Sequence, residues 1–392
     1  MHHGARNLLA FARTTRTIFA AIGQAYALAD TGGEETFARL GFKLDAAGLN
    51  RDGERGGAGI HRYGYPWGFQ RVQAPILPSN QSPLGALPAR FRRSRVLIVG
   101  CGDVGMRVAR LLTPRVRVLA LTSQAARIAP LRAAGITPLL GNLDDAHTLR
   151  RLAALGQRVL HLAPPAPTGT MDQRSAQVLR ALRLRPAPLA LVYGSTTGVY
   201  GDCQGEWVSE VRALQPQTER AHRRVDAESR VRHFGRATGA HTRVLRIPGI
   251  YAPDREGGTP LARLQKGTPV LVHEDDVYTN HIHSDDLARA CLLALWRGRA
   301  QGVYNINDDV LMKMGDYMDA AAKLYGLPPP PRMSRDALAA VVSPMQMSFL
   351  AESRRMDNRR MKRELRLVLR YPSVLDGLAQ GIALPALAIQ LA

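Results

Sequence analysis

The chain has 392 residues, 45% of them hydrophobic, with 53 Lys and Arg against 32 Asp and Glu and a formal net charge of +21. This length and composition exclude a small disulfide-stapled module, because there is ample chain to bury a core. They also exclude a membrane span, since no apolar run reaches the roughly 18 residues required and Pro385 interrupts the apolar tail GIALPALAIQLA. The three cysteines share no metal-ligand spacing, so we expect a soluble, cytoplasmic protein.

The positive charge comes almost entirely from arginine, because lysine occurs at only five positions. Such a balance is compatible with nucleic acid or an anionic membrane as a partner. The arginines are, however, scattered over many expected helices and are not gathered in one patch. The scatter therefore favours ordinary surface cations over a nucleic-acid or membrane partner, and an anionic small-molecule substrate is compatible with it.

Residues 1–92 differ from the rest of the chain. They are rich in Gly, Pro, Asn and Arg and show no sustained hydrophobic period, so they cannot bury enough apolar surface to offset the entropy of ordering. Residues 5–29 can form one amphipathic helix and loosely resemble an organelle transit peptide. A translated upstream region or a start codon placed too early is the favoured explanation. We interpret this stretch as a low-structure extension without a functional role.

A regular pattern begins near residue 93 and predicts a domain over residues 93–380. The apolar run RVLIVG is typical of a strand buried on both faces of a parallel sheet, and a helix follows over 103–112. Further strands are expected at 115–122, 136–143, 158–165 and 189–196, and further helices at 125–135, 145–156 and 171–184. This alternation predicts βαβ units and a Rossmann-like, doubly wound parallel α/β sheet.

The segment GCGDVG lies between the first strand and the first helix. Gly100 permits a tight turn, Gly102 lets a pyrophosphate approach the backbone, and Gly105 allows the helix to pack on the strand. The N–H groups at the helix N-terminus, where Asp103 and Val104 lie, then hold the phosphates. The segment therefore predicts an NAD or NADP site.

The end of the second strand bears on the choice of dinucleotide. An NAD-preferring site usually has an acid there that bonds the ribose 2′-hydroxyl. This strand ends instead with Thr122 and Ser123, and Arg127 follows one turn onward. Hydroxyls and a guanidinium favour a 2′-phosphate, so we favour NADP over NAD.

Four later motifs occur in a characteristic order: VYGSTTGVYGD, PQTERAHRRVDAE, LRIPGIY and HIHSDDLARA. From about residue 95 to about residue 378 the chain resembles the extended and atypical short-chain dehydrogenase/reductase superfamily, and more narrowly its NAD-dependent epimerase/dehydratase branch. The resemblance implies oxidoreductase-type chemistry and a smaller C-terminal substrate-binding subdomain, mainly in 252–280 and 308–380. Many relatives pair through helices of the sheet domain, so a homodimer is one expected arrangement.

The resemblance also implies catalytic positions. Ser195, with Thr196 beside it, matches the hydroxyl that polarises the substrate's carbonyl or hydroxyl oxygen. In the next helix Arg220 stands where the family has its catalytic tyrosine, and Arg224 where it has its lysine. A guanidinium stays protonated and has no acceptor lone pair, so Arg220 cannot shuttle a proton. Both arginines can instead grip a carboxylate or phosphate, and Arg224 can hold the nicotinamide ribose.

Three residues are candidates for the missing acid: Tyr200, Tyr251 and His222. In the family an acid that accepts from the adenine amine often follows the third strand, where this chain has Asn142. Further cofactor contacts are implied at Leu143, Ala163, Pro164, Pro248 and Ile250. His281 and His283 lack a third ligand, so we expect no metal.

The arginine-rich stretch of residues 353–372 shows helical spacing of its apolar residues and predicts a helix with one packed and one solvated face. The favoured function is an NAD(P)-binding epimerase, dehydratase or reductase that acts on a hydroxyl, carbonyl or sugar-like substrate. A non-catalytic sensor of NAD(P)(H) is the alternative that the missing tyrosine suggests. A nucleic-acid-binding protein is a weaker third hypothesis.

Overall fold

The computed structural model describes residues 42–43, 61–62 and 94–381. The chain divides into two units, Met1–Ala86 and Leu87–Ala392. In the first unit, β1 (Phe42–Lys43) pairs antiparallel with β2 (His61–Arg62). The remainder of the expected extension, including its amphipathic helix, and the apolar tail lie outside the described residues.

The second unit is built on a seven-stranded sheet in which all neighbouring strands are parallel, in the order β14-β9-β7-β6-β3-β4-β5. The strands are β3 (Arg95–Val99), β4 (Arg117–Thr122), β5 (Thr137–Leu140), β6 (Arg158–His161), β7 (Ala190–Thr196), β9 (His241–Ile247) and β14 (Gly302–Asn305). Both faces are covered, which explains why β3 and β7 read as continuous apolar runs.

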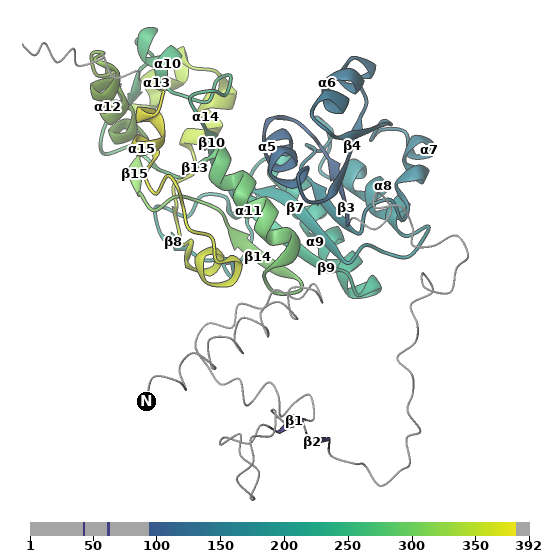
Figure 1. Cartoon of the computed structure of the whole chain (residues 1–392). Coiled ribbons are helices and arrows are strands. Elements are labelled where there is room, and N and C mark those ends of the chain that lie inside the picture. The colour runs from purple at the N-terminus through teal and green to yellow at the C-terminus, as the bar shows by residue number, and fades with distance from the viewer. Residues whose placement is uncertain (1–41, 44–60, 63–93, 382–392) are drawn as a thin grey trace, which may run out of the picture. The chain divides into compact units, whose positions relative to one another are not determined.

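Helices pack on both faces of the sheet (Figure 1). One hydrophobic cluster joins the sheet to α5 (Asp103–Leu112), α6 (Ile128–Ala133) and α11 (Ser284–Trp296). A second cluster joins the other face to α7 (Ala146–Leu149), the turn η2 (Arg150–Leu152), α8 (Gln173–Leu182) and α9 (Glu219–Thr238). The prediction of a Rossmann-like, doubly wound α/β fold is confirmed.

The strand order reverses at β3. The chain moves outward from β3 through β4 to β5 and then returns to β6 on the other side, so Val99 pairs with both Leu121 and His161. At such a switch point the connections leave in opposite directions and open a crevice at the carboxyl ends of the strands. The glycine loop after β3 lies at this crevice.

A smaller C-terminal part follows the sheet, with its own hydrophobic cluster around Leu264, Met318 and Leu378. Its helices are α10 (Leu261–Gln265), α12 (Met314–Tyr325), α13 (Arg335–Val341), α14 (Pro344–Leu350) and α15 (Val374–Ala379). Its short strands pair as β10 (Gly249–Tyr251) with β13 (His281–His283), β11 (Val270–Leu271) with β16 (Arg332–Met333), and β12 (Tyr278–Thr279) with β15 (Met312–Lys313).

The helix expected over residues 353–372 does not form. Arg355–Met356 is instead strand β17, which pairs with β8 (Trp207–Val208), and within this stretch the chain is helical only over residues 359–365, which include η4 (Met361–Leu365). Arg366, in the left-handed region with φ 55°, ends this turn. Met361 and Leu365 are buried as their spacing predicted; of the two candidates for the next apolar position, Leu369 packs against the core and Val368 is 74% exposed.

Arg107 connects the sheet domain to the C-terminal part. From α5 its guanidinium reaches Asp103 at 3.0 Å, Asp254 at 2.7 Å and Asp285 at 2.7 Å. The side chain is nearly buried, and the three carboxylates come from α5, the loop after β10 and the start of α11. One cation thus ties the glycine-loop helix to two elements far away in the sequence.

The described helices include none that is long and apolar enough to cross a membrane. All three cysteines are buried and unbridged.

Burial of Asp308 makes a prediction about stability. Asp308 is 1% exposed, and burial raises its pKa to about 8. Between about pH 4 and pH 8 the unfolded chain releases this proton while the folded chain keeps it, so stability falls as the pH rises. We expect Asp308→Asn to flatten this decline and to raise the free energy of unfolding at pH 8 by more than about 1 kcal/mol. Urea denaturation at pH 5 and pH 8 measures the effect.

The exposed Asp336, in the first turn of α13, provides the control, because Asp336→Asn removes the same charge from a surface site. Equal slopes of stability against pH for both variants and the natural chain would contradict the assignment.

Candidate active site

The glycine loop is shaped by contacts that only glycine permits. Gly100 has φ 92°, and a Cβ there would lie 2.6 Å from the Cα of Ala163, which follows β6. A Cβ on Gly105 would lie 2.7 Å from the carbonyl oxygen of Gly100. Gly100 therefore lets the loop approach the end of β6, and Gly105 lets α5 pack closely against the loop.

Gly102 provides the open position of the loop. A Cβ at this exposed residue would meet nothing within 4 Å, and no side chain caps the α5 N-terminus. The first-turn N–H groups, at Asp103 and Val104, thus border an open space that suits a pyrophosphate. Asp103 adds a negative charge, which Arg107 and Arg255 neutralise at 3.0 Å and 2.6 Å.

The end of β4 carries no acid, as the sequence indicates. Thr122 accepts the N–H of Gln124 at 3.2 Å, and Ser123 is exposed beside it. The Arg127 Nη2 donates to the carbonyl oxygen of Cys101 at 2.7 Å, so this guanidinium lies against the glycine loop. A cation and a free hydroxyl consequently flank the place where an adenosine ribose would lie.

The turn after β5 is stabilised by hydrogen bonds between its own residues. The Asn142 amide oxygen accepts the N–H of Asp144 at 3.1 Å, so it is partly used before any ligand arrives. Leu143 is partly buried beside it. Arg174 donates to both carboxylate oxygens of Asp144, at 2.7 Å and 2.6 Å, and at 3.4 Å to the carbonyl of Pro164. The sequence reasoning missed Arg174, which joins the turn after β5 to the segment after β6.

The two hydroxyl residues that were expected to act together are separated. Ser195 is 4% exposed and donates to Glu228 Oε1 at 2.6 Å inside the protein. Thr196, the next residue along the strand, faces the other way and stays partly exposed. The structure therefore gives Ser195 a structural contact, and Thr196 retains access to a ligand.

Glu228 forms a buried ion pair with Arg246. Arg246 donates from Nη2 and Nε to the two Glu228 oxygens, at 2.7 Å and 3.2 Å, and each side chain is 3% exposed. Arg246 also donates to the Tyr200 hydroxyl at 2.7 Å, which in turn donates to Asn305 at 2.8 Å. This network locks together β7, α9, β9, β14 and the turn η3 (Thr197–Tyr200).

The network removes Tyr200 from the candidates for the missing acid. The residue is fully buried, and burial raises the pKa of Tyr200 to about 12, an effect that Arg246 only partly offsets. Tyr251 is also buried, donates to the carbonyl of Ser373 at 3.2 Å, and has its pKa raised by burial. His222 is exposed on α9. Neither tyrosine can release a proton to a ligand near neutral pH.

The two arginines on α9 have different surroundings. Arg224 donates to the Tyr193 hydroxyl at 3.0 Å and to the Gly194 carbonyl at 2.8 Å, so it is anchored to β7. Arg220 is exposed, and its guanidinium lies 4.6 Å from the centre of the Phe349 ring. Because Phe349 belongs to α14, the C-terminal part reaches the position that corresponds to the family's tyrosine.

A carboxylate that the sequence reasoning missed lies close to Thr196. A Cβ on the partly exposed Gly198 would lie 3.9 Å from both Thr196 Oγ1 and Glu352 Oε2. The Glu352 side chain is 10% exposed and pairs with Arg354 at 2.7 Å. Thr196 and Glu352 thus border one small gap above Gly198, in which a single carbon atom would make ordinary van der Waals contact with both side chains.

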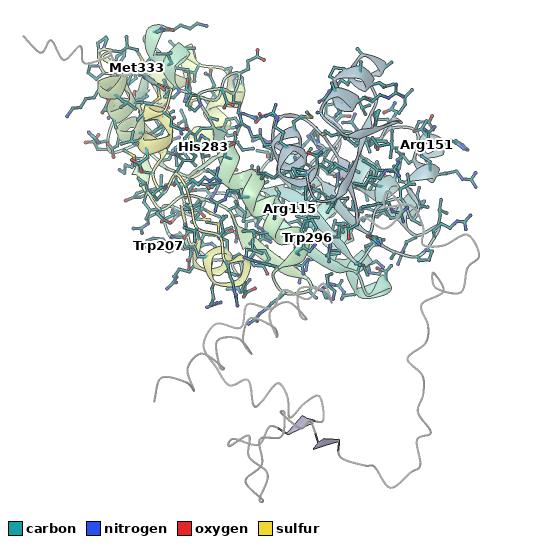
Figure 2. The ribbon with its side chains drawn as sticks, in the orientation of Figure 1. Arg115, Arg151, Trp207, His283, Trp296 and Met333 are labelled. Atoms are coloured by element: carbon teal, nitrogen blue, oxygen red, sulfur yellow. The ribbon has the colours of Figure 1, made fainter. Side chains whose placement is uncertain are left out.

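Backbone pairing holds Glu352 in place. The Ser353 carbonyl accepts the N–H groups of Cys203 and Gly205, and β17 pairs with β8 immediately afterwards. The guanidinium carbon of Arg355 lies 5.5 Å from the centre of the Trp207 ring, which is labelled in Figure 2. No local sequence signal marks this contact, because it joins segments about 150 residues apart.

Among the remaining expected positions, Ala163 is buried after β6 and Pro248 is partly buried after β9. Ile250 packs against the core in β10. His281 and His283 are buried in β13, and burial lowers the pKa of His281 to about 4. Among the described residues no group of three or more His, Cys, Asp or Glu is arranged to hold a metal ion.

The model of the NAD dependent epimerase/dehydratase family matches residues 96–307, which is more than half of the chain. The chain belongs to this family. None of the curated proteins compared with it is a match.

Three solved structures illustrate the similarity. A functionally unknown conserved protein from Silicibacter pomeroyi is 29% identical, with a TM-score of 0.61 over 73% of this chain and 97% of that one. A UDP-glucose 4-epimerase from Thermotoga maritima, solved with UDP-glucose, is 18% identical, with a TM-score of 0.59 over 73% and 96%. A dTDP-glucose 4,6-dehydratase from Streptomyces venezuelae, solved with NAD, is 22% identical, with a TM-score of 0.61 over 74% and 95%. The last two share the fold with this chain.

The buried ion pair between Glu228 and Arg246 leads to a prediction about stability. Glu228→Leu leaves the Arg246 guanidinium buried without its counter-charge, so we expect the free energy of unfolding to fall by about 3–5 kcal/mol. In the double variant Glu228→Leu/Arg246→Met both charges are gone, and the loss should be smaller than in the single variant. Urea denaturation measures both. A double variant as unstable as the sum of the two single variants would show that the pair is not coupled.

Proposed function

We propose that the protein is a nicotinamide-dinucleotide-dependent enzyme that interconverts a hydroxyl and a carbonyl on an anionic, sugar-like substrate. The observation that carries this proposal is the open glycine loop at the switch point of the sheet, together with the gap between Thr196 and Glu352 after β7. Family membership supports the reaction class.

The residues of the crevice fit a dinucleotide. Gly102 leaves the room that a pyrophosphate needs, and the uncapped N-terminus of α5 offers N–H donors. Arg224, anchored on β7, would orient the nicotinamide ribose. When bound, the nicotinamide supplies the acceptor or donor for a hydride.

NADP is the favoured form. An acid at the end of β4 would repel a 2′-phosphate, and this chain has Thr122 and Ser123 there. Arg127 lies against the glycine loop, so a small rotation of its guanidinium would let it pair with that phosphate.

Proton transfer is assigned to Glu352. Arg220 cannot accept a proton, and the pKa values of Tyr200 and Tyr251 are raised by burial. A carboxylate can take the proton of a substrate hydroxyl while Thr196 hydrogen-bonds the same oxygen. In the reverse direction the Glu352 carboxyl group returns the proton to the carbonyl oxygen.

Arg220 is assigned to the anionic part of the substrate. It is exposed and lies on the same helix as Arg224, and the one contact of its guanidinium among the residues that the structure describes is with the Phe349 ring. Guanidinium groups pair bidentately with phosphate or carboxylate. Sugar nucleotides such as the UDP-glucose of the Thermotoga maritima structure carry such a charge.

The first test is a calorimetric titration of the full chain with NADPH and, separately, NADH. We expect Arg127→Ser to weaken NADPH binding at least about tenfold while NADH binding changes by less than about twofold, because only NADPH carries the 2′-phosphate. Arg150→Ser, on the exposed turn η2, is the control for loss of net charge. If neither dinucleotide binds, the proposed function fails.

The second test concerns Glu352. Hydride exchange is measured with labelled NADPH and a panel of sugar nucleotides, acidic sugars and keto acids. Glu352→Gln keeps the shape of the side chain but loses the base, so we expect exchange about 10²–10⁴ times slower with unchanged NADPH affinity. Glu206→Gln changes a carboxylate in the loop before β8, which pairs with Arg212 at the surface, and should leave exchange unchanged.

The arginines at the tyrosine and lysine positions motivate a second candidate function, a non-catalytic sensor of NAD(P)(H). Exchange that appears only in an Arg220→Tyr/Arg224→Lys variant would favour the sensor. Unchanged exchange in Glu352→Gln would instead remove Glu352 from the mechanism and leave the rest of the proposal standing.

A further inference from the structure

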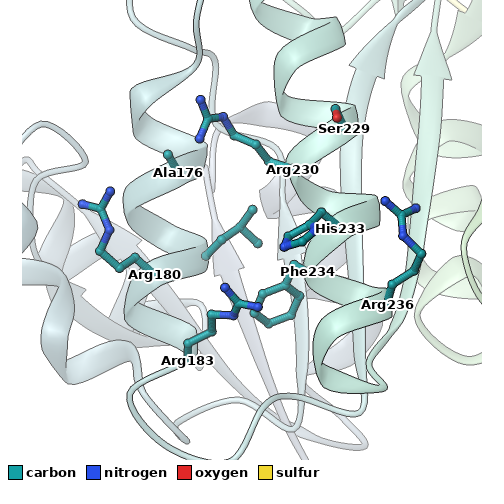
Figure 3. Close-up of a pocket in the computed structure, with 9 residues that line it drawn as sticks. Ala176, Arg180, Arg183, Ser229, Arg230, His233, Phe234 and Arg236 are labelled. Atoms are coloured by element: carbon teal, nitrogen blue, oxygen red, sulfur yellow. The ribbon is translucent and has the colours of Figure 1, made fainter.

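A groove of about 420 Å³ lies between α8 and α9 on the outer side of the sheet domain (Figure 3). Arg180 and Arg183 border it from the α8 side, and Arg230 borders it from α9. Leu179 and Phe234 form its apolar floor, where both helices pack onto the sheet. The groove therefore combines a desolvated base with a cationic rim.

The charges around this groove are poorly compensated. None of the described residues that line it is acidic. Within the described part of the chain, the guanidinium groups of Arg180 and Arg183 make no hydrogen bond or ion pair, and that of Arg230 uses only its Nε, which donates to Asp226 at 2.7 Å. Arg236 and His233 add a fourth and a fifth basic group to the lining. Several guanidinium groups are thus left with free donors around one cavity.

Cations gathered around a low-dielectric floor repel one another more strongly than cations spread over an open surface. The dipole of α8 favours a cation in its last turn and so accounts for Arg180, but Arg230 lies in the middle of α9. A bound anion would relieve this repulsion, and guanidinium groups bind phosphate oxygens bidentately.

We propose that the groove is a second ligand site, which binds the diphosphate group of a small phosphorylated molecule. Its volume falls in the roughly 300–1,000 Å³ range of small-molecule sites and far exceeds the about 30 Å³ of one water, so a single phosphate ion would not fill it. Cations on both walls match a ligand with charge at more than one point.

The groove is separate from the dinucleotide crevice. In a βαβ unit the helix runs opposite to its strands, so the C-terminal halves of α8 and α9 lie toward the amino edge of the sheet. Arg183 and His233 belong to those halves, whereas Gly102 lies at the carboxyl edge. A second copy of the chain paired across this face would set arginines against arginines.

The test is a calorimetric titration of the full chain with pyrophosphate at low ionic strength, without and with saturating NADPH. We expect pyrophosphate to bind in both conditions. Arg180→Ser/Arg183→Ser should weaken binding at least about tenfold, and Arg230→Ser, a second variant, should weaken it in the same direction. The melting temperature of each variant checks that it remains folded.

The matched control is Arg150→Ser/Arg151→Ser. It removes the same charge from the exposed turn η2, where Arg151 points away from the sheet (Figure 2), and should change binding by less than about twofold. Equal weakening in both double variants would mean diffuse attraction and would overturn the proposal. So would the absence of binding, or binding that NADPH abolishes and the groove variants leave unchanged.

A single-stranded RNA oligonucleotide distinguishes the source of the phosphates. RNA that fails to displace pyrophosphate supports a small ligand. RNA that displaces it, with the same dependence on Arg180 and Arg183, overturns the assignment to a small molecule and makes the groove a nucleic-acid contact.

Discussion

The carboxyl edge of the sheet depends on one buried ion pair. Removing Glu228 and Arg246 from water is costly unless every remaining donor and acceptor finds a partner. Ser195 and Tyr200 supply those partners, and their hydroxyl groups are consumed in doing so. The same pair joins α9 to β9, so it also sets where Arg220 and Arg224 project along the helix. A ligand can therefore contact only polar groups that the ion pair does not use, above all the Thr196 hydroxyl.

Local rules explain why much of the fold could be predicted. The alternation of apolar runs and helical spacing specified the doubly wound sheet, and GCGDVG specified the turn after β3. Gly100 and Gly105 are needed because the backbone passes too close to Ala163 and to the loop itself for any side chain. The arginine positions also followed from the sequence, because α9 is a continuous helix and spacing along a helix is reliable.

The rest depended on contacts between distant segments. Tyr193 and Ser195 share one face of β7, the face that meets α9, and the period of two along a strand directs Thr196 to the other face. This signal was present in the sequence, but it becomes decisive only when the partner Glu228 is known. The expected helix over 353–372 failed for a related reason, since pairing of β17 with β8 outweighed local helical spacing.

The candidate site is assembled from two parts of the chain. The glycine loop and Thr196 lie within residues 96–307, the span that the family model matches, whereas Glu352 lies beyond it on a segment held by a two-residue strand. Under the role proposed for Glu352, the cofactor loop and the proton-transfer group therefore lie on separate segments. A match over residues 96–307 then does not by itself include the residue that moves the proton.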